Sequence, residues 1–80
     1  MDRIEIMQRL NALFREVFDD EDIQLCDETT ADDIAEWDSM MHLNLIVAIE
    51  GEFGMKFTMI EVVEMNSIGD MVGVIGGKLA

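Results

Sequence analysis

Three residues that could do chemistry stand close together near the middle of the chain: Asp38, Ser39 and His42. An acid, a serine and a histidine are the residue types of a hydrolytic triad. Here they fall within five positions at one predicted helix start, where successive side chains point about 100° apart, so a base cannot line up behind Ser39. No glycine lies nearby to open an oxyanion hole. We therefore expect no enzyme; a hydrolase would require ester turnover that His42→Ala abolishes.

The acidic residues match no metal-binding motif. The acidic run at residues 19–22 resembles part of a calcium loop, but it lacks the central glycine and the closing glutamate at the required spacing. The single histidine, His42, cannot build a three-ligand zinc site by itself. The sequence also has no Gly-rich phosphate loop, no Cys-x-x-Cys pair and no His-Glu-x-x-His motif. We expect no metal site and interpret the acidic run as a solvated face.

A predicted helix over residues 39–53 positions the serine. Asp38 or Ser39 can serve as its N-cap, and Gly54 stops it. Apolar side chains circle most of its circumference, so we expect it to lie at the centre of the fold, covered on more than one side. An earlier amphipathic helix ends near Phe18. Its apolar face comprises Ile6, Leu10, Leu13 and Val17, with Met7 and Phe14 beside them.

Capping signals predict the remaining elements. Thr58 can cap a short helix over residues 59–64, although the β-branched residues there also suit a strand; a lone strand would have no partner. Ser67 and Asp70 resemble a capping box that opens a last helix, and Thr30 with Asp33 resembles another, for a single turn over residues 31–35. The buried stripe of the last helix is predicted to be Ile68, Met71, Val72, Ile75 and Leu79.

These elements predict an all-α fold, a small four-helix bundle in one domain over residues 1–80. Three helices are longer, the third is short, and a long loop joins the first to the second. That loop is strongly acidic, because residues 16–38 hold eleven acids and no base. The single cysteine, Cys26, cannot form an internal disulfide, and we expect it to fill space in the fold.

Charge and length exclude several classes of protein. The 80 residues include 18 acids and 5 bases, for a net charge of -13, so the chain would repel nucleic acids and anionic lipids. The longest uncharged run, residues 39–49, is too short to span a membrane, and the amino terminus lacks a signal-peptide pattern. We expect a cytoplasmic protein without membrane insertion, and a fold that low ionic strength destabilises.

The run EWDSMMHLNLIVAIEGEFGMKF, residues 36–57, resembles the second-helix region of acyl carrier proteins. The signature of that family is Asp-Ser followed by a large apolar residue, here Asp38-Ser39-Met40, and the order of elements agrees along essentially the whole chain. The resemblance implies that a magnesium-dependent phosphopantetheinyl transferase attaches 4'-phosphopantetheine from coenzyme A to Ser39. The thiol of that arm would carry an acyl group as a thioester. A phosphodiester also suits a helix N-terminus.

The resemblance implies roles for the neighbours of Ser39. Asp38 would help the transferase and its metal engage the site; alternatively, it only caps the helix. Met40 would shield the base of the arm and contact partner enzymes; alternatively, it packs in the core. Trp37 would contact partners, or act as a hydrophobic staple at the helix entry. The expected walls of an acyl pocket, which could equally be plain core, are Leu45, Ile49, Val62, Met65 and Ile68.

The same reasoning predicts a partner-binding surface for enzymes with basic docking patches. Its residues are Trp37, Met41, Asn44, Glu50, Glu52, Glu61 and Glu64. The sequence around Ser39 departs from that of fatty-acid carriers. Glu36 stands where those carriers usually have a glycine, two residues before the Asp, and Met41, Asn44 and Gly51 stand at helix positions where they usually have acids. A carrier for polyketide or related specialised biosynthesis is thus as consistent as one for fatty acids. An aminoacyl or peptidyl carrier, and an acidic helical adaptor for a basic partner, remain alternatives. We expect a monomer.

Overall fold

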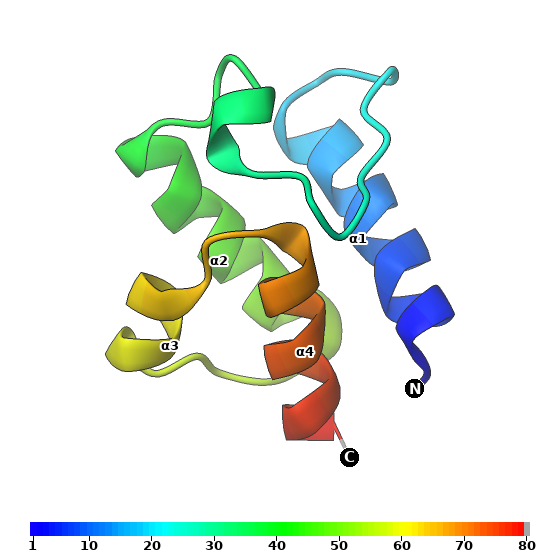
Figure 1. The fold of residues 1–80 in the computed structure, drawn as a ribbon, viewed down its shortest axis with the longest axis vertical. Coiled ribbons are helices and arrows are strands. Elements are labelled where there is room, and N and C mark those ends of the chain that lie inside the picture. Colours follow the sequence, from blue (N-terminus) through cyan, green and yellow to red (C-terminus); the bar gives the residue numbers. More distant parts are fainter. Residues whose placement is uncertain (80) are drawn as a thin grey trace.

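The computed structural model describes residues 1–79, and within them it contains only helices, turns and loops. This confirms the all-α four-helix fold (Figure 1). The elements in chain order are α1 (Arg3–Val17), a 3-10 turn η1 (Ala31–Asp33), α2 (Ser39–Phe53), α3 (Met59–Glu64) and α4 (Ile68–Leu79).

Helix α1 presents an apolar face slightly rotated from the predicted one. The Asp2 side chain accepts a hydrogen bond from the Glu5 backbone N–H at 2.8 Å, which caps the helix. Its buried residues recur every fourth position: Ile6, Leu10 and Phe14, followed by Phe18 at the C-cap. Leu13 and Val17 are only half-buried because the two phenylalanines take the side that faces the core.

Helix α2 begins and ends where the sequence predicts. Asp38 caps its start, and Gly54 ends it in the left-handed conformation with φ 64°. Helix α1 packs against both α2 and α4, and one side of α2 lies in solvent. Leu43 and Val47 are 63% and 68% exposed. The apolar residues that circle α2 are therefore not all buried.

Helix α3 starts at the predicted capping box, and α4 starts at the predicted cap Ser67, although the Asp70 carboxylate accepts the Asn66 N–H at 3.1 Å instead of closing a box with Ser67. The Thr58 backbone N–H donates to Glu61 Oε1 at 2.8 Å, and the Asp70 N–H donates to Ser67 Oγ at 3.2 Å. The α4 side chains Ile68, Met71, Val72 and Ile75 complete the core, whereas Leu79 is half-buried.

The long loop between α1 and α2 crosses one end of the bundle (Figure 1). Backbone bonds attach it to α4: Ile68 N–H donates to Thr29 O at 2.9 Å, and Gly69 N–H donates to Asp27 O at 3.0 Å. The predicted turn over residues 31–35 is shorter, spanning Ala31–Asp33. Cys26 is exposed rather than filling space, because Leu25 takes the inward position beside it.

In the part of the chain that the structure describes, no helix is both long and apolar enough to cross a bilayer.

Candidate functional site

Ser39 is the first residue of α2, and its side chain is exposed. Asp38 precedes it in extended conformation, and its carboxylate accepts the Met41 backbone N–H at 2.9 Å. The N–H groups of Ser39 and Met40 make no hydrogen bond with any of residues 1–79. An exposed hydroxyl thus stands at the positive end of a fifteen-residue helix, beside two unpaired donors.

A groove of about 420 Å³ runs from Ser39 toward α3. It is formed where the end of the long loop, the first turn of α2 and the far half of α3 meet; α3 lies beside α2 in Figure 1. Its lining residues are Ala31, Trp37, Asp38, Ser39, His42, Val62, Val63 and Met65. The α3 wall is apolar and the α2 wall is polar, so the groove could hold a chain with both polar and apolar segments.

The Ser39 and His42 side chains form no nucleophile and base pair. His42 Nδ1 instead accepts the Trp37 indole N–H at 3.1 Å. The Asp38 carboxylate is engaged by the Met41 N–H and does not orient the imidazole. This arrangement lacks the serine, histidine and acid relay that serine hydrolysis needs.

The five predicted acyl-pocket residues divide into two groups. Val62 and Met65 line the groove beside Ser39. Leu45, Ile49 and Ile68 are completely buried in the core. An acyl chain in the groove would therefore touch the first group directly and reach the second only by displacing core side chains.

The predicted partner-binding residues are spread over two helices and the α2 entry. Trp37 and Met41 are half-buried, whereas Asn44 is exposed. Among the acids, Glu50 lies 3.8 Å from Lys56 Nζ and Glu52 lies 3.5 Å from Arg9 Nη1. These lengths describe loose ion pairs, although the Glu50 side chain is only 15% exposed and its carboxylate also accepts the Phe57 backbone N–H at 2.8 Å.

The remaining two acids of that set lie on α3. Glu61 pairs with Lys78 Nζ at 2.8 Å, and this hydrogen bond, with that of the Thr58 backbone, lowers the pKa of the Glu61 carboxyl. Glu64 is exposed and pairs with no cation in residues 1–79. Of the four acids, it is therefore the one whose charge is not offset by a neighbouring base.

Sequence reasoning missed three residues of the groove, namely Ala31, His42 as a wall, and Val63. His42 could have been found from spacing, because residues i and i+3 of a helix share a face and His42 follows Ser39 by three. Sequence reasoning also missed the exposed apolar face of α3, where Met59, Ile60 and Val63 are all more than two-thirds exposed. This face continues into the groove through Val63.

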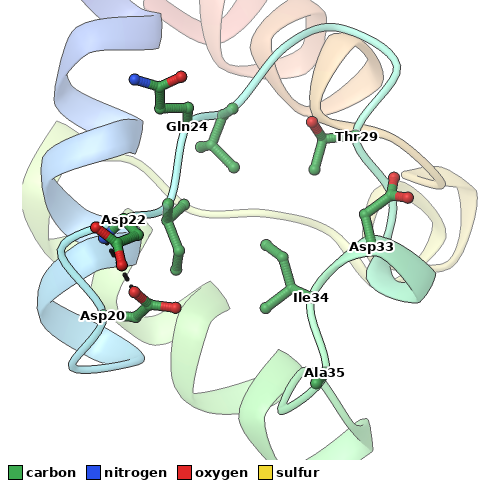
Figure 2. Close-up of a pocket in the computed structure, with 9 residues that line it drawn as sticks. Asp20, Asp22, Gln24, Thr29, Asp33, Ile34 and Ala35 are labelled. Atoms are coloured by element: carbon green, nitrogen blue, oxygen red, sulfur yellow. Dashed lines mark hydrogen bonds between the residues drawn. The ribbon is translucent and has the colours of Figure 1, made fainter.

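A second hollow lies under the long loop (Figure 2). Its volume is about 280 Å³, and its lining combines acids with apolar residues: Asp20, Asp22, Ile23, Gln24, Leu25, Thr29, Asp33, Ile34 and Ala35. The Asp22 backbone N–H donates to Asp20 Oδ1 at 3.0 Å. Across residues 1–79, no three acid, histidine or cysteine side chains converge closely enough to hold a metal ion.

An exposed serine at a capped helix start thus lies beside a groove in a small acidic helical bundle. Comparison with protein families matches residues 8–75 to the phosphopantetheine attachment site model. The fold is similar to the solution NMR structure of the holo acyl carrier protein from Geobacter metallireducens, with a TM-score of 0.87 and 41% identity over 91% of this chain and 84% of that one. A comparison with curated proteins found no match.

The chain belongs to the acyl carrier protein family. Its cofactor is covalently attached 4'-phosphopantetheine. Proteins with this domain are carriers rather than catalysts, and they act with a phosphopantetheinyl transferase and with biosynthetic enzymes.

Proposed function

We propose that Ser39 is the attachment residue and that this chain carries acyl intermediates for fatty-acid, polyketide or related specialised biosynthesis. The observation that carries the proposal is the exposed Ser39 hydroxyl at the start of α2, inside the matched residues 8–75 and beside the groove. The chain performs no chemistry of its own on the cargo, and the transferase activates the hydroxyl. The thiol of the bound arm forms the thioester that holds the acyl chain.

The surroundings of Ser39 fit a phosphodiester. The two unpaired N–H groups, of Ser39 and Met40, and the positive end of the α2 dipole favour a negative charge at this point. Asp38 is the one carboxylate directly at the helix start, and its bond to the Met41 N–H holds it in the capping position. We propose that the transferase and its magnesium ion engage Asp38 from the solvent side.

We propose that an acyl or pantetheine segment lies in the groove along α3. Val62, Val63 and Met65 supply an apolar wall, and Met65 is unbranched and adapts to different contents. We propose that short acyl groups rest there. Long chains would have to open the core at Leu45, Ile49 and Ile68, which are completely buried.

Partner enzymes would dock at the start of α2 and along α3. Met40 is 74% exposed beside Ser39 and offers an apolar contact at the point where the arm leaves. Glu64 offers an unpaired charge to a basic patch, whereas Glu50, Glu52 and Glu61 already face cations of this chain. We propose docking through a mixture of apolar contact and charge, by a monomeric carrier.

Intact mass spectrometry tests the attachment residue. The wild type, Ser39→Ala and Ser67→Ala are incubated with coenzyme A, magnesium and a broad-specificity transferase. Ser67 is a matched control because it is also a serine at a helix start, on α4. We expect one phosphopantetheine adduct on the wild type and on Ser67→Ala, and none on Ser39→Ala. A folded wild type that stays unmodified beside a known carrier would favour the acidic adaptor.

Loading of the modified protein separates the classes of cargo. Fatty-acyl, polyketide-type and aminoacyl loading enzymes are offered separately to the holo form. Thioester formation with the first or second supports the proposal, and loading by the aminoacyl enzyme alone would replace it with an aminoacyl carrier.

A further inference from the structure

Trp37 and His42, the only tryptophan and the only histidine, form a pair at the mouth of the groove. The indole N–H donates to His42 Nδ1 at 3.1 Å, and the two ring planes differ by only 22°. The bond links the residue before Asp38 to the first turn of α2, so it brackets Ser39 on both sides.

The indole is itself held by α1. Its centroid lies 5.3 Å from that of Phe14, in an edge-to-face arrangement at 78°, and 6.2 Å from that of Phe18. Both phenylalanines are buried in the core. Because the indole cannot turn freely, its N–H fixes the orientation of the imidazole.

The Trp37 bond also selects the tautomer of His42. A neutral imidazole has one N–H donor and one acceptor nitrogen, and here Nδ1 is the acceptor. The proton must then lie on Nε2. Nε2 makes no hydrogen bond with any of residues 1–79. No buried polar side-chain atom of these residues lacks a hydrogen-bond partner, so the unbonded Nε2 is not buried and is accessible to solvent. His42 lines the groove together with Ser39, three residues before it on the same helix.

We propose that His42 is a cofactor-binding residue whose Nε2–H donates a hydrogen bond to an oxygen of the phosphopantetheine group on Ser39, and that Trp37 is the positioning residue that presents this donor. The inference rests on the attachment of the arm to Ser39. The acceptor is either a phosphodiester oxygen or an amide carbonyl of the arm, which share the chemistry of an unprotonated oxygen.

Nuclear magnetic resonance of the apo and holo proteins at about pH 8 tests the proposal. The single indole and single imidazole give unambiguous ¹⁵N signals. Conversion to the holo form should shift the ¹⁵N resonance of His42 Nε2 in the wild type. Comparison of holo wild type with His42→Phe then identifies the acceptor, by a change in the ³¹P signal for the phosphodiester or in the arm carbonyl ¹³C signal for the amide.

Trp37→Phe separates positioning from packing, because it keeps an aromatic ring against Phe14 and Phe18 but removes the N–H. We expect the ratio of Nε2–H to Nδ1–H tautomers in the apo protein to fall about fivefold, as loss of one ordinary hydrogen bond implies. The substitution Gln8→Ala, at an exposed position of α1, is the control and should leave this ratio unchanged.

The outcomes are distinct. A holo adduct that forms on Ser39 but leaves the His42 ring signals as in the apo form would overturn the cofactor-binding role while the proposed function stands. An unchanged tautomer ratio in Trp37→Phe would overturn the positioning role. Absence of any adduct on the folded wild type would remove the proposed function, and this inference with it.

Discussion

Two glycines of α4 provide a sharp test of how the long loop is held above the site. Gly69 lies where the loop touches α4, and a Cβ there would come within 3.1 Å of the Asp27 backbone oxygen and 3.3 Å of its Cβ. Gly73 lies one turn further along, and a Cβ there would meet nothing within 4 Å. The same substitution to alanine therefore has opposite expected effects at the two positions.

Gly73→Ala should raise the free energy of unfolding by about 1 kcal/mol, because alanine is the better helix former in a helix interior. Gly69→Ala should lower it by about 1 kcal/mol, since the loop must move and the Gly69 N–H bond to Asp27 O, now 3.0 Å, is weakened. The difference of about 2 kcal/mol corresponds to a separation in melting temperature of roughly 8–16 °C for a domain of this size.

Urea unfolding followed by circular dichroism measures both variants beside the wild type, with the phosphopantetheine adduct as a second readout. Because the loop carries Trp37 and Asp38 to the groove, Gly69→Ala should also slow modification, whereas Gly73→Ala should not. Equal stability of the two variants would refute the reasoning, since it would mean that the loop is not held closely against Gly69.

Three further predictions concern capping, salt and pH. Asp38→Ala should lower the free energy of unfolding by about 1 kcal/mol and Asp38→Asn by much less, because only the first removes the acceptor of the Met41 N–H. Urea unfolding of both variants checks this prediction. Equal losses of stability would contradict a capping role for Asp38. With a net charge of -13, the melting temperature should rise between roughly 0.01 M and 0.15 M salt, and a constant value would exclude strong charge repulsion. Because the pKa of Glu61 is lowered in the folded state, its pairing with Lys78 stabilises the fold fully at pH values above the ordinary carboxyl pKa of 4.5. This contribution is lost as the pH falls through the lower folded-state pKa. Glu61→Gln should therefore reduce the loss of stability in that acid range, which melting curves against pH would reveal, and an identical pH profile would contradict the assignment.

Local signals were sufficient to predict the helices that carry the site. The bounds of α2 and α3 agree with the sequence prediction because their determinants act within one turn: Asp38 accepts the Met41 N–H, and Thr58 exchanges bonds with Glu61. Gly54 ends α2 because a residue without a Cβ readily adopts its φ of 64°. The acyl carrier family was also recognisable from sequence, since its Asp-Ser-apolar tripeptide and order of elements are local or sequential features.

Burial was harder to predict, because it depends on which helices meet. Leu43 and Val47 look like core residues in the sequence but stay exposed, since no helix within residues 1–79 covers this side of α2. Cys26 is exposed for a related reason, as the irregular loop turns Leu25 inward instead. Periodicity describes the faces of one helix and cannot say which face finds a partner.

The sequence by itself determined the helical class, the limits of α2 and α3, and the serine at a capped helix start, because each depends on contacts between residues a few positions apart. The tertiary structure alone decided what surrounds that serine. Val62 comes to the groove from α3 and Met65 from the C-cap of that helix, and α1 holds Trp37 so that its indole fixes the imidazole of His42. These contacts join segments whose meeting depends on how the whole chain packs, and no local pattern encodes that.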